Sequence, residues 1–332
     1  MPARLTIRFA AAPARELILA DGQESVVGRD PECGVVVDDD RVSRRHAVFT
    51  FGDSGWTVTD LGSKNGTLVN GARIARQRLA ERSWISFGGL LAHFEALTAP
   101  VEALRDERRR RLTTALEIGR ELNPLNPGES LKELLSRAVA SMQKLTNAER
   151  GFLLLVGDDG EFEVAARSGL SWDDLRSAEF GGSVGAVERV LSGGQPVVSA
   201  DARADAELGA RASIVSGGIR ALLCVPVHAL DRRIGVMYAD SRQPGAAFTE
   251  LDLEILEELA EQTGIAIAAA RLNSELRGLA ERIADDPAAT LRPELRTTTT
   301  LLPAPQPAVP AKDFRDTWHE LLAAQETLGA AS

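Results

Sequence analysis

The sequence predicts a multidomain protein: an all-β sandwich, then an α/β domain with an antiparallel sheet, joined by helical linkers and followed by a largely disordered C-terminal tail. Three observations predict this. Short apolar runs between Gly, Asp, Pro and Asn clusters fill residues 4–97, as is typical of an antiparallel sandwich. Helix-like and strand-like patterns alternate over residues 129–275 and end in one long apolar helix. Residues 285–312 are rich in Pro, Ala and Thr, a composition that cannot form a core.

Length and composition limit the class of protein. The 332 residues suffice for two ordinary domains, and 44% of them are hydrophobic, enough for real cores. No apolar run approaches the roughly 20 residues of a membrane span, and the first residues do not resemble a secretory signal. Cys33 and Cys224 fall in different predicted domains and suggest neither a disulfide scaffold nor a zinc site. We therefore expect a reduced, cytoplasmic protein without a metal or cofactor.

The charge is unevenly distributed. Residues 1–100 hold 12 basic and 12 acidic residues, whereas residues 112–275 hold 15 basic and 25 acidic ones; the net charge of the chain is -10. A neutral first part and an acidic middle argue against nucleic-acid binding, which requires a basic face. Positive charge in the first 100 residues must therefore be local to loops.

Those loops surround a predicted hairpin. Strand-like runs at 47–51 and 56–59 are joined by a turn at 52–55, with polar clusters at 43–46 and 64–67 on either side. A hairpin brings its two ends together, so both clusters should lie at one edge of a sheet. Gly28 and Arg29 end another predicted strand, 25–27. The side chains of these loops are hydrogen-bond donors suited to a phosphate, and they include no nucleophile paired with a base.

The order and spacing of five short motifs make the prediction specific. The motifs are Gly28-Arg29, Ser43-x-x-His46, Asp60-Leu61-Gly62-Ser63, Asn65-Gly66-Thr67 and Asn70-Gly71. This pattern resembles the forkhead-associated (FHA) domain, and the resemblance covers nearly all of residues 5–97. It implies an eleven-stranded sandwich that reads phosphothreonine peptides.

The resemblance also implies roles for individual residues. Expected phosphate contacts are Arg29, Ser43, Thr67 and Arg44. Expected contacts to the peptide main chain are Asn65 and Asn70. Residues expected to shape the site without touching the ligand are Gly28, His46 and Gly66. A phosphothreonine carries about -1.5 to -2 charges and three acceptor oxygens, which a forked guanidinium and directed hydroxyl donors match well.

Residues 99–124 are predicted to form a helical linker. The four arginines at 108–111 project around the whole helix at about 100° each, so they do not make a one-sided patch. A solvated linker helix is the favoured interpretation, and contact with an anionic membrane or nucleic acid is the alternative. Pro124 and Pro127 end the helix.

Residues 125–276 form the second predicted domain, whose last helix extends to about residue 284. Helices are expected at 130–145, 184–191 and from 249 onward, and strands at 151–156, 162–166, 221–227 and 233–239. This order, with Leu-Cys-Val-Pro-Val at 223–227 and Ile-Gly-Val-Met-Tyr at 234–238, is similar to the GAF domain. The resemblance implies an α/β sensor module that holds a small molecule or dimerises. The long apolar last helix favours a parallel homodimer.

No particular ligand of this domain is indicated. Phe248 and Asp252 match part of a cyclic-nucleotide signature, but Leu253 replaces its glutamate and no Asn-Lys pair precedes them. A core aromatic and a helix-start carboxylate are the better interpretation. Cys224 lies in an apolar run and is expected in the core rather than at a bilin. His228 could serve as a haem ligand, although most such histidines are surface or core residues.

The tail divides into a flexible linker, 285–312, and a short amphipathic helix, 313–332. The apolar residues of this helix are Phe314, Trp318, Leu321, Leu322 and Leu328. The helix either folds back onto a domain or orders on a partner.

The linker contains Thr290 and the tract Thr297, Thr298, Thr299 and Thr300. We hypothesise that a serine/threonine kinase phosphorylates the tract and that the chain's own FHA domain captures it, in cis or across a dimer. A plain Thr-rich linker is the alternative. Mass spectrometry that finds no phosphate on the tract after treatment with a cognate kinase would reject the hypothesis.

Together these features predict a non-catalytic signalling protein. It would recognise phosphothreonine-containing partners, such as a serine/threonine kinase or its substrates, and would sense a small molecule or dimerise through its second domain. The alternative is a small-molecule-responsive GAF sensor in which the FHA domain is only an interaction scaffold.

Overall fold

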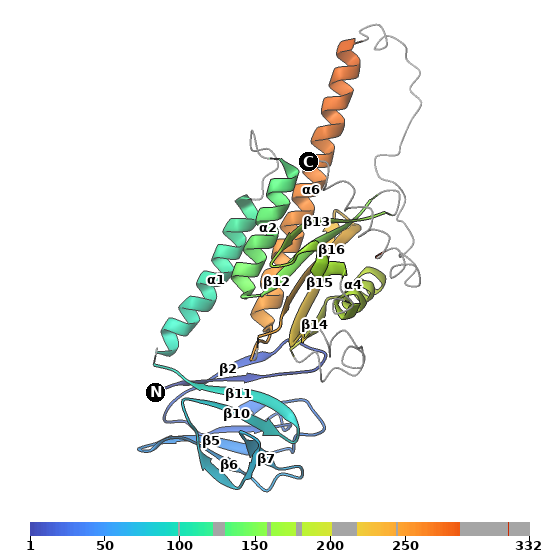
Figure 1. The fold of residues 1–332 in the computed structure, drawn as a ribbon. Coiled ribbons are helices and arrows are strands. Elements are labelled where there is room, and N and C mark those ends of the chain that lie inside the picture. The colour runs from blue at the N-terminus through green and yellow to red at the C-terminus, as the bar shows by residue number, and fades with distance from the viewer. Residues whose placement is uncertain are drawn as a thin grey trace.

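The computed structural model describes residues 1–98, 100–121, 130–157, 161–176, 181–200, 218–243, 245–285 and Trp318. They form a β-sandwich and an α/β domain, with a long helix that extends beyond the second domain (Figure 1). Among these residues, no helix combines the length and the apolar character needed to cross a membrane.

The first domain consists of two facing sheets. One has the strand order β2-β1-β11-β10-β7-β8 and the other β4-β3-β5-β6-β9. All pairs are antiparallel except β3 and β4. The strands are β1 (Ala3–Ile7), β2 (Arg15–Leu19), β3 (Ser25–Gly28), β4 (Val35–Val36), β5 (Ala47–Gly52), β6 (Gly55–Asp60), β7 (Thr67–Val69), β8 (Ala72–Ile74), β9 (Arg76–Arg78), β10 (Arg82–Phe87) and β11 (Leu90–Ala96).

The predicted sandwich is confirmed, and aromatic rings fill its centre. Phe49 of β5 stacks on Phe94 of β11 with 6.1 Å between ring centroids, and it meets Phe87 edge-on at 6.2 Å. All three rings are fully buried. The sequence did not predict β8 and β9, because these three-residue strands are partly or wholly polar and show no apolar alternation.

The second domain has a five-stranded antiparallel sheet in the order β13-β12-β16-β15-β14. Its strands are β12 (Arg150–Val156), β13 (Phe162–Ser168), β14 (Val197–Ser199), β15 (Ala221–Ala229) and β16 (Arg232–Ser241). The helices are α1 (Val101–Glu121), α2 (Leu131–Thr146), α3 (Trp172–Arg176), α4 (Gly181–Gly193) and α6 (Glu250–Asp285). The order of helices and strands predicted from the sequence is confirmed.

Helices α2 and α6 pack on one face of this sheet, and α4 packs on the other (Figure 1). The α6 backbone approaches β15 closely, since a Cβ on Gly264 would lie 1.8 Å from the carbonyl oxygen of His228. The small residues in the middle of α6 therefore let the helix lie directly on the sheet. Thr249 and Asp252 cap its start: the Asp252 carboxylate accepts hydrogen bonds from the Thr249 N–H (2.8 Å) and hydroxyl (2.7 Å).

Helix α1 packs one face on the second domain, while Arg108, Arg109 and Arg110 are exposed to solvent. Ala115 is buried, and Leu112 and Ile118 pack with it against the core shared by α2 and α6. Arg111, the last of the four arginines, donates hydrogen bonds to the Asp252 carboxylate and to the carbonyl oxygen of Leu145. Apolar residues three apart, more than the arginines, determine where this helix lies.

The two domains contact each other through the chain between β1 and β2. The Ala14 N–H donates to the carbonyl oxygen of Phe248 (2.7 Å), and the Glu250 N–H donates to that of Ala14 (3.2 Å). The Ala200 N–H also donates to the carbonyl oxygen of Phe9 (3.3 Å). Phe248, just before α6, and Glu250, the first residue of α6, are therefore hydrogen-bonded directly to the first domain.

Beyond residue 285, only Trp318 is described. It is helical, 2% exposed, and part of the apolar cluster on the α4 side of the second domain's sheet. The two alternatives for the C-terminal segment were folding back onto a domain and ordering on a partner. Trp318 folds back onto the second domain. The threonine tract and the other apolar residues of the predicted tail helix lie outside the described residues.

Candidate functional site

Three connecting segments meet at one end of the first domain. They follow β3, precede β5 and follow β6, and these strands are neighbours in one sheet. The Arg29 N–H donates to the carbonyl oxygen of Ser43 (3.0 Å), which joins the first segment to the second. The Lys64 N–H donates to the Ser43 hydroxyl oxygen (3.0 Å), which joins the third to the second. The structure thus brings both polar clusters and Arg29 together.

The buried side chain of His46 joins two of these segments through hydrogen bonds. Its ring is fully buried, with Phe87 edge-on at 5.7 Å. Nδ1 accepts the Ser43 N–H (3.1 Å), so the proton lies on Nε2, which donates to the carbonyl oxygen of Gly66 (3.2 Å). Burial lowers the pKa of His46 below its ordinary value, so the ring is neutral at pH 7. His46 therefore positions Ser43 and does not face a ligand.

The side chain of Asp60 holds the segment after β6 in place, also through hydrogen bonds. Its carboxylate accepts the Gly62 and Ser63 N–H groups (both 2.9 Å), the Ser63 hydroxyl (2.6 Å) and the Thr67 hydroxyl (2.7 Å). Burial raises the pKa of Asp60, but the hydrogen bonds from Ser63, Thr67 and Gly62 outweigh it and lower the pKa to about 2. The ionised carboxylate holds this segment in one conformation.

Two glycines allow the segments to approach closely. A Cβ on Gly28 would lie 2.1 Å from the carbonyl oxygen of Arg44, so no other residue fits there without a backbone shift. Gly66 has φ +82°, and its carbonyl oxygen accepts from both His46 and the Gly88 N–H (3.1 Å). Both glycines lie under the exposed donors.

Four side chains present donors on the outside of this end. Arg29 is 43% exposed, and its guanidinium pairs with Asp40 at 2.9 Å. The Ser43 oxygen accepts from Lys64, which leaves its O–H to donate outward. Arg44 and Lys64 are exposed. Three full positive charges and one hydroxyl donor can therefore meet an anion here.

Asn65, Thr67 and Asn70 differ in what they offer. Asn65 is exposed, and its Nδ2 donates to the carbonyl oxygen of Arg41 (2.8 Å). Thr67 is fully buried with its hydroxyl committed to Asp60, so it is not among the exposed donors. The Asn70 side-chain oxygen accepts the Trp84 N–H (2.9 Å), and its φ is 49°. Thr67 therefore helps to hold Asp60 in place, and Asn70 shapes the turn after β7.

Two further residues were not singled out from the sequence. Lys64 was seen as part of a polar cluster, but the hydrogen bond from its main-chain N–H to the Ser43 hydroxyl oxygen places this residue beside the exposed donors. Asp40 is 97% exposed and occupies one edge of the Arg29 guanidinium. The order of residues alone did not indicate that pair, because Asp38, Asp39 and Asp40 are consecutive and any of them could reach Arg29.

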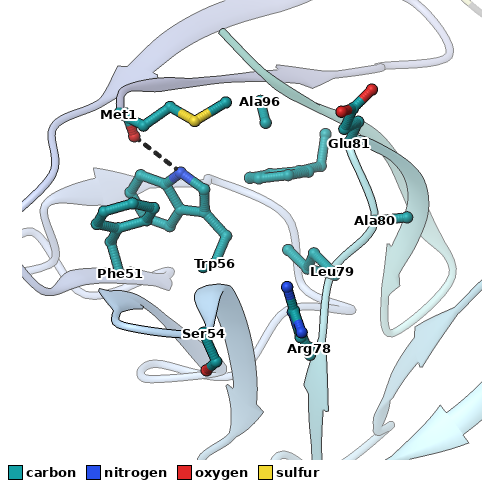
Figure 2. Close-up of a pocket in the computed structure, with 11 residues that line it drawn as sticks. Met1, Phe51, Ser54, Trp56, Arg78, Leu79, Ala80, Glu81 and Ala96 are labelled. Carbon is teal, nitrogen blue, oxygen red and sulfur yellow. Dashed lines mark hydrogen bonds between the residues drawn. The ribbon is translucent and has the colours of Figure 1, made fainter. Parts of the chain in front are cut away.

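A separate hollow of about 450 Å³ lies at the far end of the sandwich (Figure 2). It is lined by the rings of Phe51, Trp56 and Phe94 together with the Met1 side chain, and Trp56 Nε1 donates to the Met1 carbonyl oxygen at 3.0 Å. Strand β5 starts just after His46 and ends at this hollow. The hollow is therefore not part of the phosphate-compatible end.

In the second domain, the predicted core role of Phe248 and the helix-start role of Asp252 are confirmed by burial and by the Thr249 hydrogen bonds. Cys224 is fully buried, as expected for a core residue, and burial raises the pKa of its thiol. His228 is exposed.

Comparison with known families agrees with the division of the chain into a β-sandwich and an α/β domain. A family model for the FHA domain matches residues 25–88, and one for the GAF domain matches residues 130–267. The chain contains an FHA domain followed by a GAF domain. The loop cluster around His46 and Asp60 falls inside the FHA match, and the sheet that packs against Trp318 falls inside the GAF match.

Bacterial relatives share part of the chain. An oxoglutarate dehydrogenase inhibitor of Corynebacterium diphtheriae is 48% identical over 52 residues, which are 16% of this chain and 36% of that protein. The glycogen accumulation regulator GarA of Mycobacterium tuberculosis is 35% identical over 88 residues, 26% of this chain and 53% of that one. The matches thus span about a third to a half of these relatives' lengths.

Solved structures are also similar to part of the chain. One, studied for phosphothreonine-dependent FHA domain interactions, is 25% identical, covers 30% of this chain and all of its own, and has a TM-score of 0.28. Another, Mycobacterium tuberculosis EmbR with a low-affinity phosphopeptide, is 26% identical, covers 29% of this chain and 26% of its own, and has a TM-score of 0.26.

Proposed function

We propose that this protein is a non-catalytic regulator whose FHA domain binds phosphothreonine-containing proteins. The observation that carries the proposal is the convergence of Arg29, Ser43, Arg44 and Lys64 on one end of the sandwich. The buried His46 and the half-buried Asp60 support these loops with hydrogen bonds. Asn65, exposed beside them, would hold the peptide main chain. This assignment uses Lys64 in place of Thr67 as a phosphate contact.

Charge explains why a phosphate is the expected ligand. Arg29 already holds an anionic group, the Asp40 carboxylate, at 2.9 Å. An exposed ion pair of this kind is worth only about 0–1 kcal/mol, whereas each charge-assisted hydrogen bond to a phosphate contributes about 1.5–3 kcal/mol. A phosphothreonine should therefore displace Asp40 and take its place on the guanidinium.

The named relatives support a regulatory role. They include an inhibitor and a regulator of bacterial metabolic processes, and a kinase or its phosphorylated substrates would be the corresponding partner here. We also propose that the FHA domain captures the chain's own Thr297–Thr300 tract once a kinase has phosphorylated it. That tract lies outside the described residues.

A phosphopeptide library tests the proposed function. The full-length protein should retain phosphothreonine peptides and not the same peptides without phosphate, and Ser43→Ala should abolish retention because it removes a directed hydroxyl donor and the oxygen that accepts from Lys64. Equal retention of both libraries would contradict the proposal and favour a scaffold role for the FHA domain.

We also propose that the protein dimerises along α6. Leu272 and Leu276 are 53% and 56% exposed, and Ile265, seven residues before Leu272, is 52% exposed; this spacing keeps all three on one helix face. Leu116 of α1 is 42% exposed. Water-exposed leucines in such a row are typical of a helix that pairs with another.

Sedimentation velocity tests the dimer. Leu272→Glu should shift the protein toward monomer, because a charge in an apolar helix interface is strongly unfavourable. Ser274→Glu adds the same charge to an exposed position on another face of the helix and should leave the dimer intact. A monomeric wild type, or equal effects of the two changes, would contradict the proposal.

A further inference from the structure

One residue of the FHA domain lies directly against the start of α6. Ala14, the last residue of the connection between β1 and β2, forms a parallel β-bridge with Thr249. Its N–H donates to the carbonyl oxygen of Phe248 (2.7 Å), and its own carbonyl oxygen accepts the N–H of Glu250 (3.2 Å). Ala14 has no exposed surface, and Phe248 belongs to the core between α6 and the GAF sheet. The core of the second domain therefore fixes the position of Ala14.

The next residue connects this contact to the phosphate-compatible end of the FHA domain. Arg15 begins β2, which lies on the side of the sandwich that faces the second domain (Figure 1). Its Nη1 donates a hydrogen bond of 2.8 Å to the carbonyl oxygen of Val36 in the other sheet. Val36 lies directly opposite Gly28 in the β3–β4 pair, and Gly28 immediately precedes Arg29. A short path of peptide bonds, one hydrogen bond and one strand pairing therefore joins Ala14 to Arg29.

This path has little room to absorb a displacement. The Val37 N–H donates to the carbonyl oxygen of Gly28 (2.8 Å), and Val37 is buried. A Cβ on Gly28 would lie 2.1 Å from the carbonyl oxygen of Arg44, so the Gly28 backbone is in contact with the segment that carries Ser43. Because closely packed segments transmit strain to one another, a shift at Val36 should also move Arg29 and Ser43.

We propose that the phosphopeptide site of the FHA domain is energetically coupled to the start of α6, with Arg15 as the positioning residue that joins them. This inference rests on the proposed function, because the ligand that reveals the coupling is a phosphothreonine peptide. A ligand held by Arg29 and Ser43 stabilises the conformation in which Gly28 and Val36 lie opposite each other. Arg15 bonds Val36 in that same conformation, so peptide binding and the docking of Ala14 on the second domain favour each other.

The coupling gives the FHA site a route to the rest of the chain. Helix α6 begins at Glu250, runs for 36 residues and carries the exposed apolar row proposed to pair two subunits. A captured phosphoprotein would therefore stabilise the first turn of α6 without contacting it. Because coupling between two sites is reciprocal, a change that loosens this turn would weaken phosphopeptide binding by the same factor.

Amide hydrogen exchange of the full-length protein, read residue by residue, tests the coupling. The probe is the tightest phosphothreonine peptide from the library, at a concentration that calorimetry shows to be saturating. The amides of Ala14 and Glu250 form the hydrogen bonds that cross between the domains. The peptide should slow their exchange at least about 5-fold, because coupling between sites typically amounts to factors of about 5–150.

Two variants assign the coupling to Arg15. Arg15→Ala removes the bond to Val36, so it should bind the peptide at least about 5-fold more weakly and, at saturation, should leave the exchange of Ala14 and Glu250 unchanged. Arg4→Ala is the matched control. Arg4 lies on the neighbouring strand β1 and pairs with Glu16 at 3.6 Å, so this change removes the same charge from the same sheet. It should keep both the affinity and the slowed exchange.

The outcomes separate this inference from the proposed function. A saturating peptide that slows neither amide in the wild type would overturn the coupling and leave phosphothreonine binding intact, and this comparison needs no variant. Equal slowing in the wild type and in Arg15→Ala would overturn the role of Arg15. Absence of phosphate-dependent binding in the calorimetry would overturn the proposed function and the coupling together.

Discussion

Replacing Arg29 by alanine is expected to weaken binding of a phosphothreonine peptide by at least about 10- to 100-fold. The expectation follows from the loss of a charge-assisted contact worth about 1.5–3 kcal/mol. The domain itself should remain folded, because Arg29 is partly exposed and its ion pair with Asp40 contributes about 1 kcal/mol at most. Titration calorimetry with one peptide measures the change.

Two further variants make this test specific. Arg82→Ala removes the same charge from the other end of the sandwich, where Arg82 is 75% exposed and pairs with Glu95, and should leave affinity nearly unchanged. Asp40→Ala frees the Arg29 guanidinium and should raise affinity slightly. Equal losses in Arg29→Ala and Arg82→Ala would mean that net charge, and not the loop geometry, drives binding.

Replacing Asp240 by alanine is expected to destabilise the GAF domain by about 3–5 kcal/mol. Asp240 of β16 is fully buried, and its carboxylate accepts two hydrogen bonds from Arg150 (both 2.7 Å) and one from the Tyr238 hydroxyl (2.9 Å). Without it, the buried Arg150 guanidinium loses its counter-charge, and leaving such a charge unpaired is what costs stability. Differential scanning calorimetry should show a GAF transition lowered by about 6–20 °C.

The control for Asp240 is an ion pair at the surface of the same domain. Glu254 of α6 lies 3.5 Å from Arg108 of α1, and both are at least half exposed, so Glu254→Ala should change stability by less than about 1 kcal/mol. The double change Arg150→Met with Asp240→Leu removes both charges and should recover most of the loss. A small effect of Asp240→Ala would contradict the importance assigned to the buried pair.

The FHA fold and most of its exposed donors could be predicted because both depend on local order in the chain. The sequence itself contains apolar runs of strand length and the characteristic spacing of Arg29, Ser43 and Asn65. The position of Thr67 could not be predicted in the same way. Its hydroxyl bonds Asp60, seven residues earlier, and nothing in the motif distinguishes an inward from an outward hydroxyl.

Packing between segments that are far apart in the chain was the other feature that could not be predicted from the sequence. The four consecutive arginines of α1 predicted a solvated helix, but Leu112, Ala115 and Ile118 pack one face of the helix on the GAF core. Trp318 belongs to a core whose other described members end at Tyr238, and its neighbours in sequence carry no mark of that contact. Periodicity indicates that a helix has an apolar face, but it does not identify which surface covers that face.

The most direct test of the central claim is a calorimetric comparison of one peptide in two forms. The full-length protein should bind the phosphothreonine form with a dissociation constant of about micromolar order and the unphosphorylated form at least about 100-fold more weakly. Equal affinity for the two forms would contradict the claim that the Arg29, Ser43, Arg44 and Lys64 end of the FHA domain reads phosphothreonine.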